Sequence, residues 1–345
     1  MDVTDGISSA AQAGKKNRNF LGAVVIGRNE GDGLLRCLAS LRPDCEKIVY
    51  VDSGSNDGSA AAAAALGADV VDLDLSSPFT AARARNAGFR RLNEISPNLA
   101  YVQFVDGDCE VIEGWIKAAE EFLGSRADVV AVCGRRMERS PNASIYNAMC
   151  HREWNTPVGS ADSFGGDFLI RSDAFAQVGG FSDEQVAHEE PELCGRLRAA
   201  GFRIWRIEAA MTLHDAKIFR LKQFYTRNRR AGFGIAQALV RSGLTIDPGG
   251  KAILRRALTW TFAPLLASFT GFITLGAPGF FALAVYPVQV LRHAIVDKQE
   301  AGGSLGNRLM VAALGMIGKF GEAHGAIEFL IKNAKGSQLT PIFYK

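Results

Sequence analysis

The residues best suited to chemistry are two carboxylates, Asp106 and Asp108, which follow the apolar run Tyr101–Val105 and are separated by one glycine. The run predicts a buried strand, so the two carboxylates would lie at the carboxyl edge of a sheet, where open α/β folds bind their ligands. Carboxylate oxygens are the ligands that hard divalent cations prefer. The spacing therefore predicts a site for a cation that also holds a diphosphate.

Two other predicted strands end in polar residues. Arg28 and Glu30 follow the apolar run 21–26, and Asp52 follows the run 47–51. If these strands are parallel, their ends meet at one edge of the sheet. The first strand is followed by Gly-Arg-Asn-Glu, which matches neither the G-x-G-x-x-G dinucleotide fingerprint nor the P-loop pattern. The sequence thus predicts a nucleotide site in which a metal, rather than a glycine cradle, neutralises the diphosphate.

Predicted strands and helices alternate around these residues. Besides the three strands above, we expect helices near 34–41, 60–66, 81–92, 115–123, 174–178 and 190–200 and strands near 68–71, 129–133, 164–170 and 203–207. This alternation predicts an α/β domain with a mostly parallel central sheet covered by helices. We place this catalytic domain at 20–245 and the first 19 residues, which lack an apolar core, in a disordered leader.

The composition narrows the function classes. The chain has 345 residues and a formal charge of only +3, and its first 200 residues contain no basic stripe with interleaved aromatics, so we expect no nucleic-acid partner. Six cysteines are scattered without a Cys-x-x-Cys pair, as is typical of reduced thiols in a cytosolic compartment.

The last hundred residues, 246–345, differ sharply from the rest. Residues 258–275 and 279–291 carry no charge, only Gly-Ala-Pro separates them, and basic residues flank both sides. The pattern predicts a hydrophobic hairpin at about 257–296 with both ends in the cytoplasm, which could span the membrane, re-enter it or lie in its plane. A buried helical pair in a soluble domain is the alternative. A further amphipathic helix at about 308–332 would lie at the membrane interface or pack onto the catalytic domain.

Taken together, these motifs resemble those of the inverting glycosyltransferases of family 2, which have the GT-A fold. The resemblance runs from about Ala23 to His214 and rests on several motifs that occur in family order. They are Arg28-Asn29-Glu30, Asp52 to Ser59 with Ser53 in place of a second Asp, Ala84 to Gly88, Asp106-Gly107-Asp108, and Gly165-Gly166-Asp167, with Asp167 in place of Asn, followed by Arg171 and Gly179-Gly180-Phe181.

The resemblance assigns roles to the strand-end residues. It implies that Asp52 hydrogen-bonds the nucleobase while Arg28 lies against it, with Glu30 in the same turn. Arg85 would approach the nucleotide or its diphosphate, unless it is only a helix-surface arginine. Asp106 would contact the nucleotide. Asp108 would ligate the metal, Mg²⁺ or Mn²⁺. His214 would be a further metal ligand or, alternatively, a polar residue at the rim of the site.

The catalytic base of the family is the Asp of a Glu-Asp pair at the start of a helix, and here Glu190 stands at that position after Glu189. Inverting transfer needs a carboxylate to take the proton of the acceptor hydroxyl. We therefore expect Glu190 to be the base, with Glu189 as the rival. Glutamate would act from one methylene further away.

Other residues have two interpretations each. Arg227, Arg229 and Arg230 would clamp a leaving diphosphate or attract anionic lipid headgroups. Trp154 would stack on a sugar ring or serve as packing.

The resulting hypothesis is a metal-dependent glycosyltransferase anchored at the cytoplasmic face of the cell membrane by the C-terminal hairpin. It would move a sugar, with inversion, from a nucleotide-diphosphate donor to a hydroxyl of a lipid-linked or polysaccharide-precursor acceptor, with membrane lipids as further partners. The alternatives are a nucleotidyltransferase and a non-catalytic, membrane-tethered sugar-nucleotide-binding protein.

Overall fold

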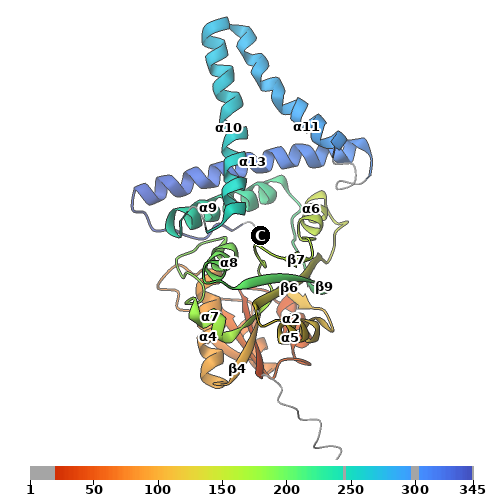
Figure 1. The fold of residues 1–345 in the computed structure, drawn as a ribbon, viewed down its shortest axis with the longest axis vertical. Coiled ribbons are helices and arrows are strands. Elements are labelled where there is room, and N and C mark those ends of the chain that lie inside the picture. Colours follow the sequence, from red (N-terminus) through yellow and green to blue (C-terminus); the bar gives the residue numbers. More distant parts are fainter. Residues whose placement is uncertain (1–19, 244–245, 297–302, 344–345) are drawn as a thin grey trace, which may run out of the picture.

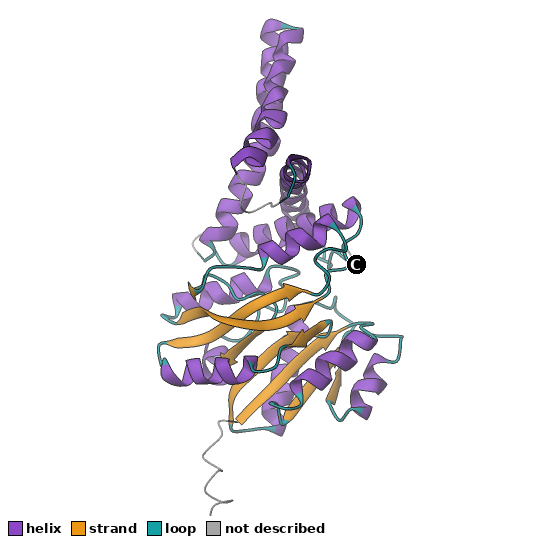
Figure 2. Ribbon diagram, turned by 90° about the vertical axis from the view of Figure 1, so that its right-hand side faces the viewer, coloured by secondary structure: helices purple, strands orange, loops and turns teal. Residues whose placement is uncertain are grey.

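The computed structural model describes residues 20–243, 246–296 and 303–343, so the predicted leader lies outside the described residues. A nine-stranded sheet forms the centre of the α/β part of the chain, in the order β3-β2-β1-β4-β8-β6-β9-β5, with β7 paired to β9. In Figure 1, α4, α7 and α8 lie on one side of the strands and α2 and α5 on the other, and Figure 2 shows the sheet in side view.

The first half of the sheet is parallel, as the alternation predicts. It consists of β1 (Phe20–Gly27), β2 (Lys47–Asp52), β3 (Asp69–Asp72) and β4 (Leu99–Asp106), connected through α2 (Asp32–Leu41), α3 (Ser59–Ala65) and α4 (Ala81–Ile95). Strands β1, β2 and β4 are apolar along nearly their whole length, as expected for strands whose two faces are both covered by helices, whereas the short strand β3 at the edge is only partly buried. Their pairing aligns Gly27 with Asp52 and Ile26 with Asp106, so the strand ends do meet at one edge.

The second half of the sheet is mixed, which corrects the expectation of a mostly parallel sheet for this part. β8 (Phe168–Arg171) pairs antiparallel with both β4 and β6 (Val129–Glu138), whereas β6 pairs parallel with β9 (Arg203–His214). Two short strands, β5 (Cys109–Val111) and β7 (Gly159–Ser160), also pair antiparallel with β9. The helices here are α5 (Trp115–Ser125), α6 (Ile145–Glu153), α7 (Ser172–Gln177) and α8 (Glu189–Ala199).

The C-terminal part is helical. It contains α9 (Leu221–Arg241), α10 (Pro248–Leu275), the 3₁₀ helix η1 (Ala277–Ala284), α11 (Val285–Val296) and α13 (Leu305–Ala334). In Figure 1, α9 and α13 lie against each other above the sheet, and α10 and α11 project away from the body as a hairpin. Helices α9 and α13 cross closely at Gly232 and Gly325, where an added Cβ would collide with the partner backbone. Helix α13 thus packs onto α9. Helix α9 in turn contacts the α/β part of the chain, where Gln237 Oε1 accepts the N–H of Val186.

The hairpin exposes a large apolar surface. Segments 248–275 and 277–296 are each long and apolar enough to cross a membrane by length and composition, and only 11% of the most apolar window of each is buried. Phe269 and Ile273 on α10 are 63% and 66% exposed, and Phe281 in η1 is 79% exposed. The two segments are therefore not a buried helical pair, which was the alternative expectation.

Candidate active site

A cavity of about 820 Å³ lies between the carboxyl edge of the sheet and the C-terminal helices. The predicted site residues Arg28, Glu30, Arg85, Asp106, Asp108, Glu189, Glu190 and His214 all line it. They come from five elements far apart in the sequence, and the strand register and the start of α8 bring them together. Asp52 is the one predicted site residue that is not among the lining residues.

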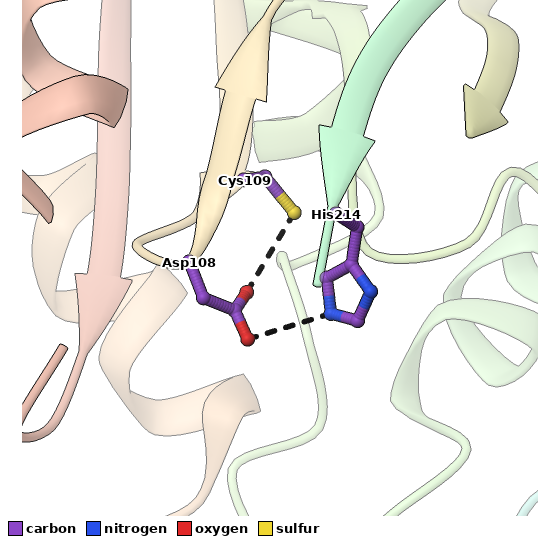
Figure 3. Close-up of side chains that lie close together, drawn as sticks. All are labelled: Asp108, Cys109 and His214. Atoms are coloured by element: carbon purple, nitrogen blue, oxygen red, sulfur yellow. Dashed lines mark hydrogen bonds and ion pairs between the residues drawn. The ribbon is translucent and has the colours of Figure 1, made fainter. Parts of the chain in front are cut away.

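Asp108 and His214 line this cavity and Cys109 lies buried beside them, and Figure 3 shows the three side chains pointing toward one another. Asp108 Oδ2 lies 3.4 Å from His214 Nε2, and Cys109 Sγ lies 3.7 Å from Asp108 Oδ1. The pairing of β5 with β9 places Cys109 directly opposite His214, and side chains of directly opposed residues lie on the same face of a sheet. The carboxylate of Asp108 and the imidazole of His214 suit a divalent cation, whereas burial raises the pKa of the Cys109 thiol, which stays protonated and donates to Asp108. Cys109 was not predicted, although its place directly after Asp108 was a signal.

Arg85 is buried and connects three carboxylates. Its Nη2 lies 2.9 Å from Asp106 Oδ1 and 3.1 Å from Glu190 Oε1, and its Nη1 donates to Glu189 Oε1 at 3.0 Å. Burial acts to lower the pKa of Arg85, but the carboxylates outweigh burial and raise it, so the guanidinium stays charged. The side chain is only 2% exposed, which rules out the interpretation of a helix-surface arginine.

A second arginine holds Asp106 from the other side. Arg136 Nη2 lies 3.3 Å from Asp106 Oδ2 and 2.8 Å from Oδ2 of the fully buried Asp167. Asp167 also accepts hydrogen bonds from the backbone N–H of Asp106 at 3.1 Å and from the hydroxyl of Thr212 at 2.6 Å. Arg136 could not be selected from the sequence, because β6 carries no motif and the contact of Arg136 with Asp106 exists only in the folded chain.

Gly166 leaves the space that this network needs. A Cβ at this position would come within 2.6 Å of Asp106 Oδ2 and 2.8 Å of Arg136 Nη2. Any larger residue would therefore push apart the two ion-paired side chains. The Gly165-Gly166-Asp167 motif thus has a local physical role: it supplies both the free space and the counter-charge for Arg136.

Glu189 and Glu190 begin α8 and differ in environment. The side chain of Glu189 is 4% exposed and hydrogen-bonded to Arg85, whereas that of Glu190 is 15% exposed. Burial raises the pKa of Glu190, and the negative charges of Glu189 and Asp106 raise it further, while Arg85 opposes the shift. A carboxylate with a raised pKa is a stronger proton acceptor than an ordinary glutamate.

The first two strand ends have different roles in the structure. Arg28 lies over the ring of Phe79, with its guanidinium carbon 4.9 Å from the ring centroid. Asp52 is buried: Oδ1 accepts the hydroxyl of Tyr50 at 2.9 Å, and Oδ2 accepts the N–H of Ser55 at 2.7 Å. The hydrogen bond and burial both raise the pKa of Tyr50, with burial the larger cause. In this arrangement Asp52 orders the loop after β2.

The basic residues of α9 are partly engaged in ion pairs. Arg227 binds Glu153 of α6 with two contacts of 3.0 and 2.8 Å, and Arg229 binds Glu328 of α13. Arg227 and Arg230 line the cavity, and Arg229 does not. Trp154 also lines it, with its ring packed edge-on against His214 at 4.9 Å between centroids.

Comparisons with known proteins find similarity to one family of glycosyltransferases. Residues 23–176 match the model of glycosyl transferase family 2. The chain is 28% identical over 236 residues to a pre-mycofactocin glycosyltransferase of Mycobacterium tuberculosis, an alignment that covers 63% of this chain and 47% of that protein. The chain thus spans about half the length of the curated relatives it matches.

The fold is shared with a solved structure. A mannosyltransferase from Pyrobaculum calidifontis, in complex with GDP-Man and Mn²⁺, superimposes with a TM-score of 0.59 at 16% sequence identity. The superposition covers 91% of this chain and 87% of the other. At this identity the likeness concerns the fold: the chain shares the GT-A-like fold of this mannosyltransferase, and residues 23–176, a little under half of the chain, match the model of glycosyl transferase family 2.

Proposed function

We propose that this glycosyltransferase moves a sugar, with inversion and with a divalent cation, from a nucleotide-diphosphate sugar to a hydroxyl of a lipid-linked or polysaccharide-precursor acceptor. One observation carries the proposal: a single cavity is lined by Asp108 and His214, which could hold a cation, and by Glu190, a largely buried carboxylate that can accept a proton. Metal-dependent inverting transfer needs a base for the acceptor hydroxyl and a cation at the donor diphosphate, and both must act on substrates bound in the same cavity.

Asp108 and His214 would hold Mg²⁺ or Mn²⁺, and the bound cation would neutralise charge on the donor diphosphate. Arg28, Glu30 and Asp106 would contact the donor nucleotide. Asp52 would act on the nucleobase side through the loop that it orders. The strand register supports this arrangement because it aligns the ends of β1, β2 and β4.

Glu190 would be the general base, with Glu189 in support. The acceptor oxygen attacks the anomeric carbon, its proton passes to a carboxylate oxygen of Glu190, and the bond between the anomeric carbon and the phosphate oxygen breaks. Glu190 is the better candidate because its side chain is more exposed to the cavity and its pKa is raised. Arg85 would position both carboxylates rather than bind the diphosphate, since both of its Nη atoms are engaged by carboxylates.

The catalytic domain at 20–245 would work at the cytoplasmic face of the cell membrane, held there by the region 246–345. The exposed apolar surface of the hairpin supports this location, because a patch of this size marks a membrane or protein contact. Basic residues beside the hairpin favour a cytoplasmic position for both of its ends.

The test is product analysis with a panel of nucleotide sugars, including GDP-mannose and UDP-glucose, in the presence of Mn²⁺ and membrane extracts as the acceptor source. Release of nucleoside diphosphate together with a labelled glycan or glycolipid is the expected result. Release of pyrophosphate would identify a nucleotidyltransferase instead. Donor binding without any product would identify a non-catalytic sugar-nucleotide-binding protein.

A further inference from the structure

Four basic side chains line the cavity on the side of the C-terminal helices: Arg227 and Arg230 of α9, Arg256 of α10 and Lys319 of α13, which we name the basic cluster. Two carboxylates, Glu153 and Glu322, line the same part of the cavity. By count the basic cluster exceeds these carboxylates by two positive charges. A surplus of positive charge in a partly enclosed space favours an anionic ligand.

The basic cluster is held in place by internal ion pairs. Arg227 binds Glu153, and Lys319 Nζ lies 3.0 and 2.9 Å from the two carboxylate oxygens of Glu322. The pairs thus fix Arg227 and Lys319 without cancelling the positive character of the cluster.

The position of the basic cluster is informative. Arg256 is the last charged residue of α10 before the uncharged stretch 257–275, whose apolar side chains are largely exposed. The same cavity that Arg256 lines also reaches Glu190 and Asp108. An amphiphile with its chain along the hairpin would therefore place its headgroup at the basic cluster and its sugar toward the proposed base.

We propose that the basic cluster binds the phosphate or diphosphate of an amphiphilic acceptor, the group that joins the lipid chain to the sugar. This inference rests on the proposed function and assigns a chemical class to its acceptor. Guanidinium groups suit the site because they bind phosphate oxygens in bidentate geometry. The exposed apolar face of α10, which continues from Arg256, favours an amphiphile over a soluble phosphate.

The experiment measures binding of decyl phosphate to the full chain in a non-ionic detergent, by calorimetry, with decanol and inorganic phosphate as comparison ligands. Decyl phosphate should bind the wild type, and Arg256→Gln should weaken its affinity by roughly tenfold or more, the size expected for a lost charged hydrogen bond. Arg255→Gln is the matched control, because Arg255 is the neighbouring exposed arginine and does not line the cavity. The double variant Lys319→Gln/Glu322→Gln removes one positive and one negative charge together and leaves the surplus of two unchanged, so it should weaken binding less than Arg256→Gln does.

Separate outcomes would overturn the inference. Equal affinity of Arg256→Gln and Arg255→Gln would show that the cluster takes no part, and equally tight binding of inorganic phosphate would show that the ligand is a free anion. If Arg256→Gln weakened the binding of GDP or UDP in the presence of Mn²⁺ but left the binding of decyl phosphate unchanged, the basic cluster would belong to the donor site instead. Because nucleotide-sugar turnover is measured in its own assay, failure of the proposed function would be seen independently.

Discussion

Replacing Glu190 by glutamine separates the chemical role of this carboxylate from its structural role. Glutamine keeps the size of the side chain but cannot accept the proton of the acceptor hydroxyl. A positioned general base contributes about 10²- to 10⁴-fold to rate. We therefore expect kcat to fall by about 10²- to 10⁴-fold, which corresponds to roughly 3 to 5 kcal/mol of transition-state stabilisation, while the KM for the donor changes little.

The same substitution should not destabilise the fold at neutral pH. Because burial and Glu189 raise the pKa of Glu190 above its unfolded value, folding takes up a proton between the two pKa values. That contribution to stability is present at low pH and is lost as the pH rises through the folded-state pKa. Glutamine stays neutral at all pH values, so at pH 7 the Glu190→Gln variant should melt no lower than the wild type, as measured by calorimetry.

The assay follows nucleoside diphosphate release together with acceptor labelling, across pH 5 to 9. The wild type should lose kcat on the acidic side at a pH above the usual range for glutamate, and Glu190→Gln should lose this acidic limb. Glu190→Asp should restore part of the rate, since it keeps a carboxylate. Wild-type turnover by Glu190→Gln would refute the assignment, and loss of turnover confined to Glu189→Gln would move the base to Glu189.

Three further predictions concern the metal cluster, the hairpin and the buried arginine. Asp108→Asn and His214→Gln should each weaken Mn²⁺ binding at least tenfold by paramagnetic resonance titration, and unchanged affinity in both would remove the cluster from metal binding. The double variant Phe269→Glu/Ile273→Glu should fold normally, because both side chains are over 60% exposed. It should no longer bind vesicles, since each charge costs about 3 kcal/mol in the membrane interior. Flotation of the variant with vesicles would contradict the role of the hairpin as an anchor. Arg85→Met should cost about 3–5 kcal/mol of unfolding free energy at pH 7, because it leaves Glu189 and its neighbours buried without a counter-charge. The loss should shrink on acidification as these carboxylates become protonated, and a loss independent of pH would point to packing instead.

The convergence of the strand ends could be predicted from the sequence because it follows from two general rules. Parallel strands end at the same edge, and alternating strands and helices indicate parallel pairing. Only the polar residue at each strand end had to be recognised, and Asp106 and Asp108 were conspicuous. The hairpin was equally predictable, since long uncharged runs need no knowledge of tertiary structure.

The contacts inside the site could not be predicted in the same way. Arg136 reaches Asp106 only because β8 inserts antiparallel between β4 and β6, and a four-residue strand leaves a weak periodic signal. Cys109 belongs to the site because the three-residue strand β5 pairs with β9 opposite His214. Arg85 looked like one of several basic residues on a helix, and only its burial between three carboxylates distinguishes it.

Two departures from the family pattern have a common structural explanation. Glu190 stands where the family has Asp, and its longer side chain reaches Nη2 of Arg85 at 3.1 Å. Asp167 stands where the family has Asn, and its added charge is matched by Arg136 at 2.8 Å. Both arginines also contact Asp106, one at each carboxylate oxygen. Each altered carboxylate is thus tied to an arginine that holds the first aspartate of the Asp-Gly-Asp motif, so the base and the donor-binding edge are positioned by one charge network rather than independently.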